Sequence, residues 1–282
     1  MKNPIIWGYL SCLILSGCTE SIRESYRPEE EATVISLPVS SVPSMEKSLV
    51  FFFRKLEKGD TLVCCREIEG PRKDFSIYSF QLPAGYYQMI FIGNGEMEHI
   101  RFEGTPSVEN GIIDYSDGTQ PPDLYFTRNY VQAGETNRIG AGILILSSRI
   151  ALTVRNIPSG IARVKVNLQN TIAGVSMTLV NLPEATHPAI STEISVVPHS
   201  SPVIHLKSLA SYPEGGLSFL EVFCYDAQGK IAYQGQSEPF RLGGSEDIQI
   251  SCRFDAAPLS TGSSLPQTKG QQMPDFVLTK EK

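Results

Sequence analysis

A cysteine close to the start of the chain, Cys18, stands where its thiol could be modified chemically. Lys2 is the only charged side chain before it, and the 12 residues from Pro4 to Leu15 are mostly apolar. Such a run is too short for a bilayer core, which takes about 20 residues in a helix. A basic start, a short apolar run and then small residues are typical of a secretory signal. We therefore expect residues 1–17 to be a signal peptide rather than part of a buried core.

The end of this signal, Leu15-Ser16-Gly17-Cys18, resembles the bacterial lipobox. The resemblance implies cleavage between Gly17 and Cys18, a diacylglycerol on the Cys18 thiol, and usually a further acyl chain such as palmitate on its freed amine. Two or three acyl chains anchor a protein stably, because each buried CH₂ contributes about 0.8 kcal/mol. The alternative is an ordinary signal peptide with a cysteine near the cut by chance. We expect a lipoprotein of the outer membrane.

Four cysteines remain after the signal and Cys18 are set aside, and they form no zinc-type pattern. Cys64 and Cys65 are adjacent in a predicted strand, so their side chains should point to opposite faces. Cys224 and Cys252 each fall in an apolar run and could face one core. An exported location permits a disulfide between them. Two buried free thiols are the alternative that we favour.

Catalytic motifs are absent from the sequence. The four histidines, at positions 99, 187, 199 and 205, stand at no paired ligand spacing backed by a carboxylate. There is no G-x-S-x-G elbow and no nucleotide-binding glycine loop. Residues 93–96, Gly-Asn-Gly-Glu, predict a hairpin turn rather than a phosphate cradle, because no helix follows them. We expect no catalytic residue, no metal site and no cofactor.

Two acidic patterns leave alternatives open. Asp114, Asp117 and Asp123 flank a predicted loop and could hold a calcium ion. A glycosidase would need two carboxylates that meet in space, and dispersed acids could supply them. No acidic pair stands out, so a hydrolase is the weaker interpretation.

Composition narrows the class of protein. The net charge of −6 falls to about −7 once Lys2 leaves with the signal, and no basic cluster is present, which argues against nucleic-acid binding. A hydrophobic content of 41% supports a packed core. The 23 glycines and 19 prolines are spread along the chain, as turn-rich β proteins require.

Strand-like runs separated by turn signals dominate the chain. From Arg149 onward apolar and polar residues alternate, as in Ile150, Leu152 and Val154, and this period of two predicts antiparallel strands with one buried face. No long stretch has a helical period. We expect an all-β protein built from antiparallel sandwiches. The other predicted strands are 47–56, 61–67, 74–82, 86–92, 123–131 and 142–146.

Two domains of ordinary size account for the length more simply than one large core. The polar stretch after Cys18 is expected to be a flexible tether, and the Ser-, Gln- and Pro-rich end a disordered tail. Within that tail, Phe276-Val277-Leu278 could add a strand in trans. The predicted parts are a signal peptide (1–17), a tether (18–33), an N-terminal sandwich (34–148), a C-terminal sandwich (149–255) and the tail (256–282).

Several segments, taken in order, resemble the FimB/Mfa2 fimbrial anchor family of Bacteroides-type bacteria. They are the lipobox with its polar tether, the strand–Leu-Pro-Ala-Gly–strand segment 75–94, the Asp-Leu-aromatic segment 123–131, and the paired apolar strands of 143–158. The likeness spans roughly residues 18–255. It implies two tandem transthyretin-like β-sandwich domains and a non-catalytic role in fimbria assembly and cell adhesion.

The resemblance also implies partners. Pilus subunits commonly join by strand addition to an exposed sheet edge, so a fimbrial subunit is expected to dock on an edge or groove, while the lipid binds the outer membrane. Asp60-Thr61-Leu62 fits the short O-glycosylation pattern of these bacteria, at Thr61. Two alternatives are a surface glycan-binding lipoprotein and a polymerising fimbrillin. The only tryptophan, Trp7, lies in the signal, so a glycan site would use tyrosines.

Overall fold

Almost all regular structure in this protein is β-strand. Among the described residues, the one helical segment is a single 3₁₀ turn, η2 (Met97–His99), and none of them forms an apolar helix that could cross a bilayer. The prediction of an all-β fold is confirmed. The computed structural model describes residues 30–36, 45–57, 59–70, 77–138, 142–180, 189–210, 216–244, 247–255 and 270–280.

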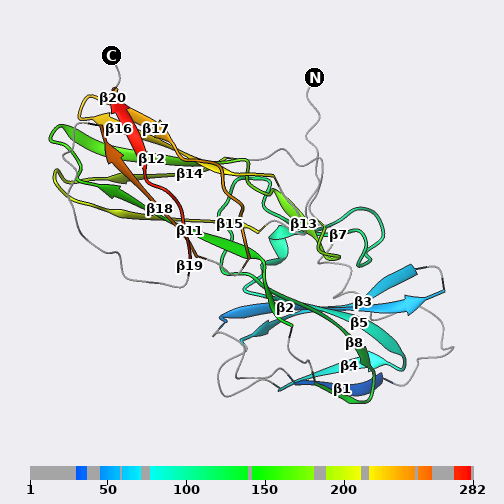
Figure 1. Ribbon diagram of the computed structural model, residues 1–282. Coiled ribbons are helices and arrows are strands. Elements are labelled where there is room, and N and C mark those ends of the chain that lie inside the picture. Colours follow the sequence, from blue (N-terminus) through cyan, green and yellow to red (C-terminus); the bar gives the residue numbers. More distant parts are fainter. Residues whose placement is uncertain are drawn as a thin grey trace, which may run out of the picture.

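The strands gather in two halves, one built from the blue-to-green part of the chain and the other from the green-to-red part (Figure 1). The centre of the N-terminal half is a five-stranded antiparallel sheet in the order β10-β8-β5-β2-β3. A three-stranded sheet, β4-β1-β9, lies on one side of it. These strands are β1 (Glu30–Ser36), β2 (Lys47–Leu56), β3 (Gly59–Glu69), β4 (Ile77–Pro83), β5 (Tyr86–Gly93), β8 (Tyr125–Gln132), β9 (Thr136–Arg138) and β10 (Leu144–Ile145).

The central strands of the five-stranded sheet, β5 and β2, are buried on both faces, which explains their continuous apolar runs. In β2, successive residues from Leu49 to Phe53 are all buried, as expected for a strand covered on two sides. Phe51 and Phe53 pack into one core cluster with Ile90. Phe52 packs into the other, against the β4-β1-β9 layer.

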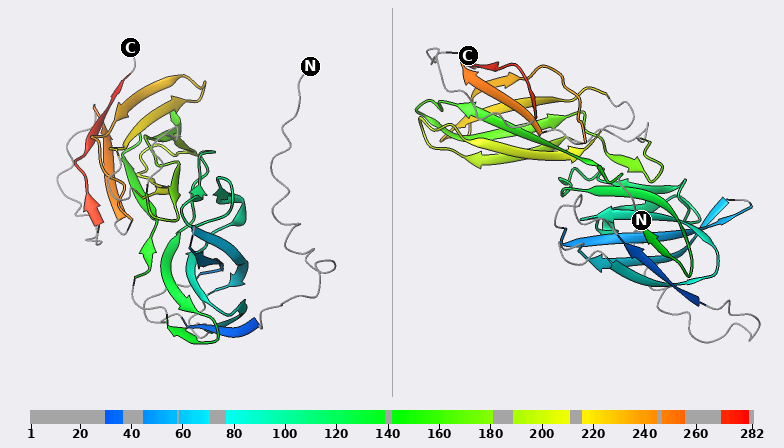
Figure 2. Two further views of the ribbon diagram at one scale, coloured as in Figure 1. Left: turned by 90° about the vertical axis from the view of Figure 1, so that its right-hand side faces the viewer. Right: turned by 60° about the horizontal axis from the view of Figure 1, so that its bottom comes forward.

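The C-terminal half is a sandwich whose two layers join into one nine-stranded sheet, in the order β14-β12-β16-β17-β20-β18-β11-β15 with β19 beside β18. Its strands alternate as predicted, since Ile150, Leu152 and Val154 are buried in a single core. Figure 2 shows the two layers facing each other. The strands are β11 (Ser147–Arg155), β12 (Ile161–Gln169), β14 (Ile190–Ser195), β15 (Val203–Leu209), β16 (Phe219–Asp226), β17 (Ile231–Gln236), β18 (Asp247–Phe254), β19 (Gly270–Gln272) and β20 (Phe276–Lys280).

The prediction of a disordered tail over 256–282 is wrong for residues 270–280. There β19 and β20 pair in parallel with β18, and β20 also pairs antiparallel with β17, so the red strand runs beside the orange one in Figure 1. Phe276 and Leu278 point into the same core as β18. The apolar cluster Phe276-Val277-Leu278 therefore adds a strand to its own chain rather than to a partner. The polar residues before it gave no sign of an ordered strand in the sequence.

The tether, predicted over 18–33, ends earlier than expected. β1 begins at Glu30 and pairs along its whole length with β4, so 30–33 belong to the fold. The acidic residues at the start of β1 carry no apolar pattern from which a strand could be predicted. They still join the sheet, because backbone hydrogen bonds between strands do not depend on apolar side chains. The rest of the tether lies outside the described residues.

The segment 93–96 is not the hairpin turn that was predicted. Asn94 has the expected positive φ of 56°, but β5 already has β2 and β8 as neighbours. The chain therefore leaves the sheet through η2 and forms β6 (Ile100–Phe102), which pairs with β7 (Gly111–Asp114).

The two halves share a core at their junction. β13 (Gly174–Ser176) follows β12 in sequence but pairs with β7 of the N-terminal half, and Figure 1 places both strands between the two halves. Val175, Met177 and Leu209 are buried together with the N-terminal residues Phe51 and Ile90. The predicted boundary at residue 148 thus cuts through packed side chains, and independent folding of the two domains stays a prediction.

Candidate functional site

The predicted processing site, Gly17 and Cys18, lies outside the described residues, and so does His187. Thr61, the predicted O-glycosylation site, lies exposed on β3. Glycosylation of Thr61 stays a prediction, but its hydroxyl is on the molecular surface, where a modifying enzyme can reach it.

Strand β3 is the longest strand of the fold and stands at the edge of the five-stranded sheet. Its 11 residues pair with β2 on one side. On the outer side the backbone N–H of Leu62 donates to the carbonyl of Pro106 at 3.1 Å. Edge strands offer N–H and C=O groups to a further strand. Arg66 and Glu67 are exposed charged residues of this strand, and Glu67 is paired with Lys47 of β2 at 3.3 Å. Charges on an edge strand discourage non-specific pairing.

The cysteines have different surroundings. Cys64 and Cys65 pack against opposite faces of the five-stranded sheet, as predicted. Cys224 on β16 and Cys252 on β18 are fully buried in the C-terminal core and are free thiols. Burial raises the pKa of Cys224 to about 12, and that of Cys252 well above its usual value. Because the thiolate is the reactive form, a raised pKa lowers the reactivity of both thiols. A disulfide between Cys224 and Cys252 stays a prediction.

The three aspartates considered for calcium each have partners of their own. The carboxylate of Asp114 accepts hydrogen bonds from the Ser116 N–H and from Arg101. That of Asp117 accepts from Thr119, and that of Asp123 from Arg149. They do not converge as a ligand set among the described residues.

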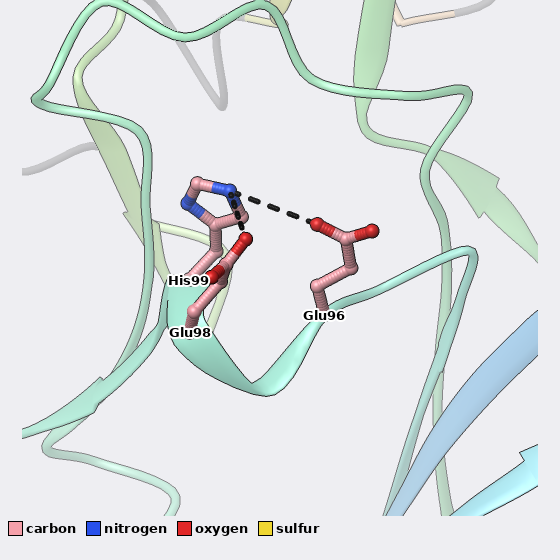
Figure 3. A group of neighbouring side chains, drawn as sticks. All are labelled: Glu96, Glu98 and His99. Carbon is pink, nitrogen blue, oxygen red and sulfur yellow. Dashed lines mark ion pairs between the residues drawn. The ribbon is translucent and has the colours of Figure 1, made fainter. Parts of the chain in front are cut away.

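A different group converges at η2, where Glu96, Glu98 and His99 face one another (Figure 3). His99 Nε2 lies 3.9 Å from Glu96 Oε2 and 3.8 Å from Glu98 Oε1. The other ring nitrogen, Nδ1, donates to the carbonyl of Asp114 at 3.0 Å. This group was not predicted from the sequence, although the spacing Glu-x-Glu-His on a tight turn could have indicated it.

The His99 ring stacks on Tyr115, with 4.0 Å between ring centroids and 17° between planes. Tyr115 is buried, and its hydroxyl has no hydrogen-bond partner among the described residues. Burial raises the pKa of Tyr115 well above 10, and the negative charges of Glu96, Asp117 and Glu98 raise this pKa further.

Two exposed tyrosines form a further surface feature. Tyr86 on β5 and Tyr130 on β8 are 67% and 69% exposed. The register pairs Gln88 with Tyr130 and Tyr86 with Gln132, so both tyrosines lie on one face of the sheet. Lys55 Nζ lies 5.9 Å from the centroid of the Tyr130 ring.

Comparison with known proteins gives a likeness of fold. No protein-family model matches the chain, and no curated protein matches it. A candidate adhesin from Bacteroides ovatus matches 91% of this chain and 99% of its own, with a TM-score of 0.51 and 12% identity.

A candidate polysaccharide-binding protein from Bacteroides thetaiotaomicron also has a TM-score of 0.51, at 8% identity over 73% of this chain and 79% of its own. The fimbrial anchor protein Mfa2 from Porphyromonas gingivalis is matched at a TM-score of 0.46, with 14% identity over 73% of this chain and 82% of its own. At these identities the first two structures share the fold with this protein.

Proposed function

We propose that this protein is a non-catalytic, lipid-anchored subunit of a bacterial surface fimbria, which holds fimbrial subunits at the outer membrane. The observation that carries the proposal is the fold shared with the B. ovatus candidate adhesin over 91% of this chain and 99% of the other. The lipobox-like sequence ending in Cys18 supports the anchor. Together they favour an exported protein that binds other proteins.

The edge strand β3 supports a mode of binding. A fimbrial subunit would add an extended segment to β3, so that its backbone groups bond to those of the edge while its side chains occupy alternate positions. Arg66 is exposed, whereas Glu67 is already paired with Lys47 at 3.3 Å, so a partner strand with an acidic residue beside Arg66 is favoured over a purely apolar one.

Site-directed photo-crosslinking tests this docking mode. A photoreactive residue at Arg66, on the exposed part of β3, should link the protein to a fimbrial subunit on intact cells. The same residue at Lys230, in the exposed turn between β16 and β17, is the matched control and should give no such product. Linkage from Lys230 alone, or from neither position, would argue against docking on β3.

A glycan-binding lipoprotein is the second candidate function, and the pair Tyr86 and Tyr130 favours it. Exposed aromatic rings can stack on the apolar faces of sugars, and Lys55 beside Tyr130 would favour acidic sugars. The fold shared with the B. thetaiotaomicron candidate polysaccharide-binding protein agrees with this function. Glycan-array binding that is lost in Tyr86→Ala/Tyr130→Ala but kept in Val197→Ala, an equally exposed side chain elsewhere, would establish it.

A further inference from the structure

We propose that Glu96, Glu98 and His99 form a binding site for a divalent transition-metal ion of the zinc type. The proposed fimbrial function does not require a metal, so this site would be an additional property of the chain. Its ligands would be one imidazole nitrogen and two carboxylate oxygens, all supplied by four consecutive residues at η2 (Figure 3).

The spacing of the ligand atoms suits one small cation. The three atoms lie within 4.8 Å of one another, and Nε2 is 3.9 and 3.8 Å from the two carboxylates. Ligands about 2.0–2.2 Å from a tetrahedral zinc ion stand about 3.4 Å apart. The Glu96 and Glu98 side chains are 57% and 76% exposed, so rotation about their side-chain bonds can close this small difference.

The imidazole of His99 is held in the orientation that a ligand needs. Since the carbonyl of Asp114 can only accept, Nδ1 must carry the proton that makes the 3.0 Å bond. In the neutral ring Nε2 then presents its lone pair, and it faces the carboxylates of Glu96 and Glu98. A backbone carbonyl bound to the second nitrogen is the usual support of a metal-binding histidine.

Stacking on Tyr115 fixes the plane of the His99 ring, whose side chain is 11% exposed. The Tyr115 hydroxyl is buried and has no hydrogen-bond partner among the described residues. A hydroxyl of this kind is a ready hydrogen-bond partner for a water on a bound ion. This unpartnered hydroxyl, on the ring that stacks against His99, is an observation independent of the three ligands.

The local charge favours a cation. Within the described part of the chain, no lysine or arginine is ion-paired with Glu96 or Glu98. The basic side chain on the neighbouring strand, Arg101, is paired with Glu103 at 2.7 Å and with Asp114 at 3.0 Å. The two glutamates therefore have no fixed positive partner apart from His99, which is positive only when protonated.

The donor set selects among divalent ions. Imidazole suits zinc, nickel and copper, whereas calcium takes six to eight oxygen ligands and magnesium keeps most of its waters. A site with one nitrogen and two oxygens leaves room for water to complete four-coordinate zinc. The competing explanation of the geometry is an ion pair of His99 with the two glutamates and no metal.

Calorimetric titration of the untagged full chain with zinc chloride, near neutral pH, tests the site. We expect one zinc ion per chain, with little heat from calcium under the same conditions. Glu96→Gln and Glu98→Gln should each weaken zinc binding at least about tenfold. Both positions are exposed, and urea unfolding of the metal-free variants should be unchanged. The matched control, Glu109→Gln, removes an equally exposed acid outside the site and should leave zinc binding unchanged.

Zinc X-ray absorption of the loaded protein supplies a second readout. Nitrogen and oxygen neighbours alone are expected; a sulfur neighbour would assign the ion to a cysteine and overturn the proposal. The proposal is also overturned if no zinc binds, or if Glu96→Gln/Glu98→Gln binds zinc as tightly as the natural chain. If no zinc binds, an ion pair of His99 with the two glutamates accounts for the geometry. None of these results bears on β3 or Cys18, so the proposed function stands or falls separately.

Discussion

Arg149 donates two parallel hydrogen bonds to the carboxylate of Asp123, from Nε at 3.0 Å and from Nη2 at 2.9 Å. Lys207 Nζ adds a third contact to Asp123, at 2.9 Å. Asp123 precedes β8 of the N-terminal half, while Arg149 and Lys207 lie on β11 and β15 of the other half. Residues 123–131 and 143–158 were recognised as two separate segments in the sequence. In the structure the Asp123–Arg149 ion pair connects them and so joins the two halves.

Removal of this carboxylate should destabilise the fold. Asp123→Asn removes the carboxylate that Lys207 and Arg149 share, and Arg149 then keeps only its longer contact with Asp247, at 3.8 Å. We expect a loss of about 1–2 kcal/mol in the free energy of unfolding, less than for a fully buried pair. The matched control is Glu193→Gln, which breaks the exposed pair with Arg163 at 2.6 Å and should cost under about 0.5 kcal/mol. Equal losses in urea unfolding would contradict a special role for the junction.

The Asp123–Arg149 pair should make the free energy of unfolding depend on pH in the acidic range. Burial acts to raise the pKa of Asp123, but hydrogen bonds from Lys207 and Arg149 outweigh it, so this pKa lies below its ordinary value. A lowered folded-state pKa stabilises the protein above the unfolded value of about 3.9, and this contribution is lost as the pH falls through the folded pKa. The stability gap between the natural chain and Asp123→Asn should therefore narrow below about pH 4. A gap that stays constant or widens in urea unfolding would exclude this linkage.

Strand β20 should contribute to the C-terminal core. Leu278 is fully buried there, so Leu278→Ala should lower the free energy of unfolding by about 2–4 kcal/mol. Val277 points away on the same strand and is only half buried, so Val277→Ala should cost clearly less. Both are measured by urea unfolding. If the two variants lose the same amount, β20 does not pack as the structure shows.

The two core thiols should be inaccessible in the folded protein. Burial raises the pKa of both Cys224 and Cys252, which suppresses the thiolate that reacts with alkylating reagents. Without reductant, both should resist iodoacetamide in buffer and react in urea, as mass spectrometry of peptides would show. Alkylation in urea that requires a reductant would instead establish the disulfide.

Local pattern was sufficient for most strands of this fold. Burial of one face of a strand gives alternating apolar residues, and burial of both faces gives a continuous apolar run. The first pattern predicted the strand with Ile150, Leu152 and Val154, and the second predicted β2. The first and last strands of the fold, β1 and β20, were harder to predict from the sequence. Strand β20 is short, and its main energetic contribution comes from β17 and β18, which are distant in sequence. No local signal reports that pairing.

The candidate sites were predictable to different degrees. A modification such as that of Cys18 depends on a contiguous sequence, so the sequence can indicate it. The group Glu96, Glu98 and His99 requires a 3₁₀ turn that points three side chains at one place, and it arises because β5 has no free edge for a hairpin. The contact between Asp123 and Arg149 likewise depends on how two sheets meet.

The retention of fimbriae on cells tests the central claim most directly. A strain that lacks this protein would be complemented with the natural chain, with Cys18→Ala, or with Cys12→Ala as a control cysteine inside the signal. Labelled palmitate should enter the natural chain and Cys12→Ala but not Cys18→Ala, and only the first two should keep fimbriae attached rather than shed into the medium. Equal retention of fimbriae in the strain without the protein would contradict the account.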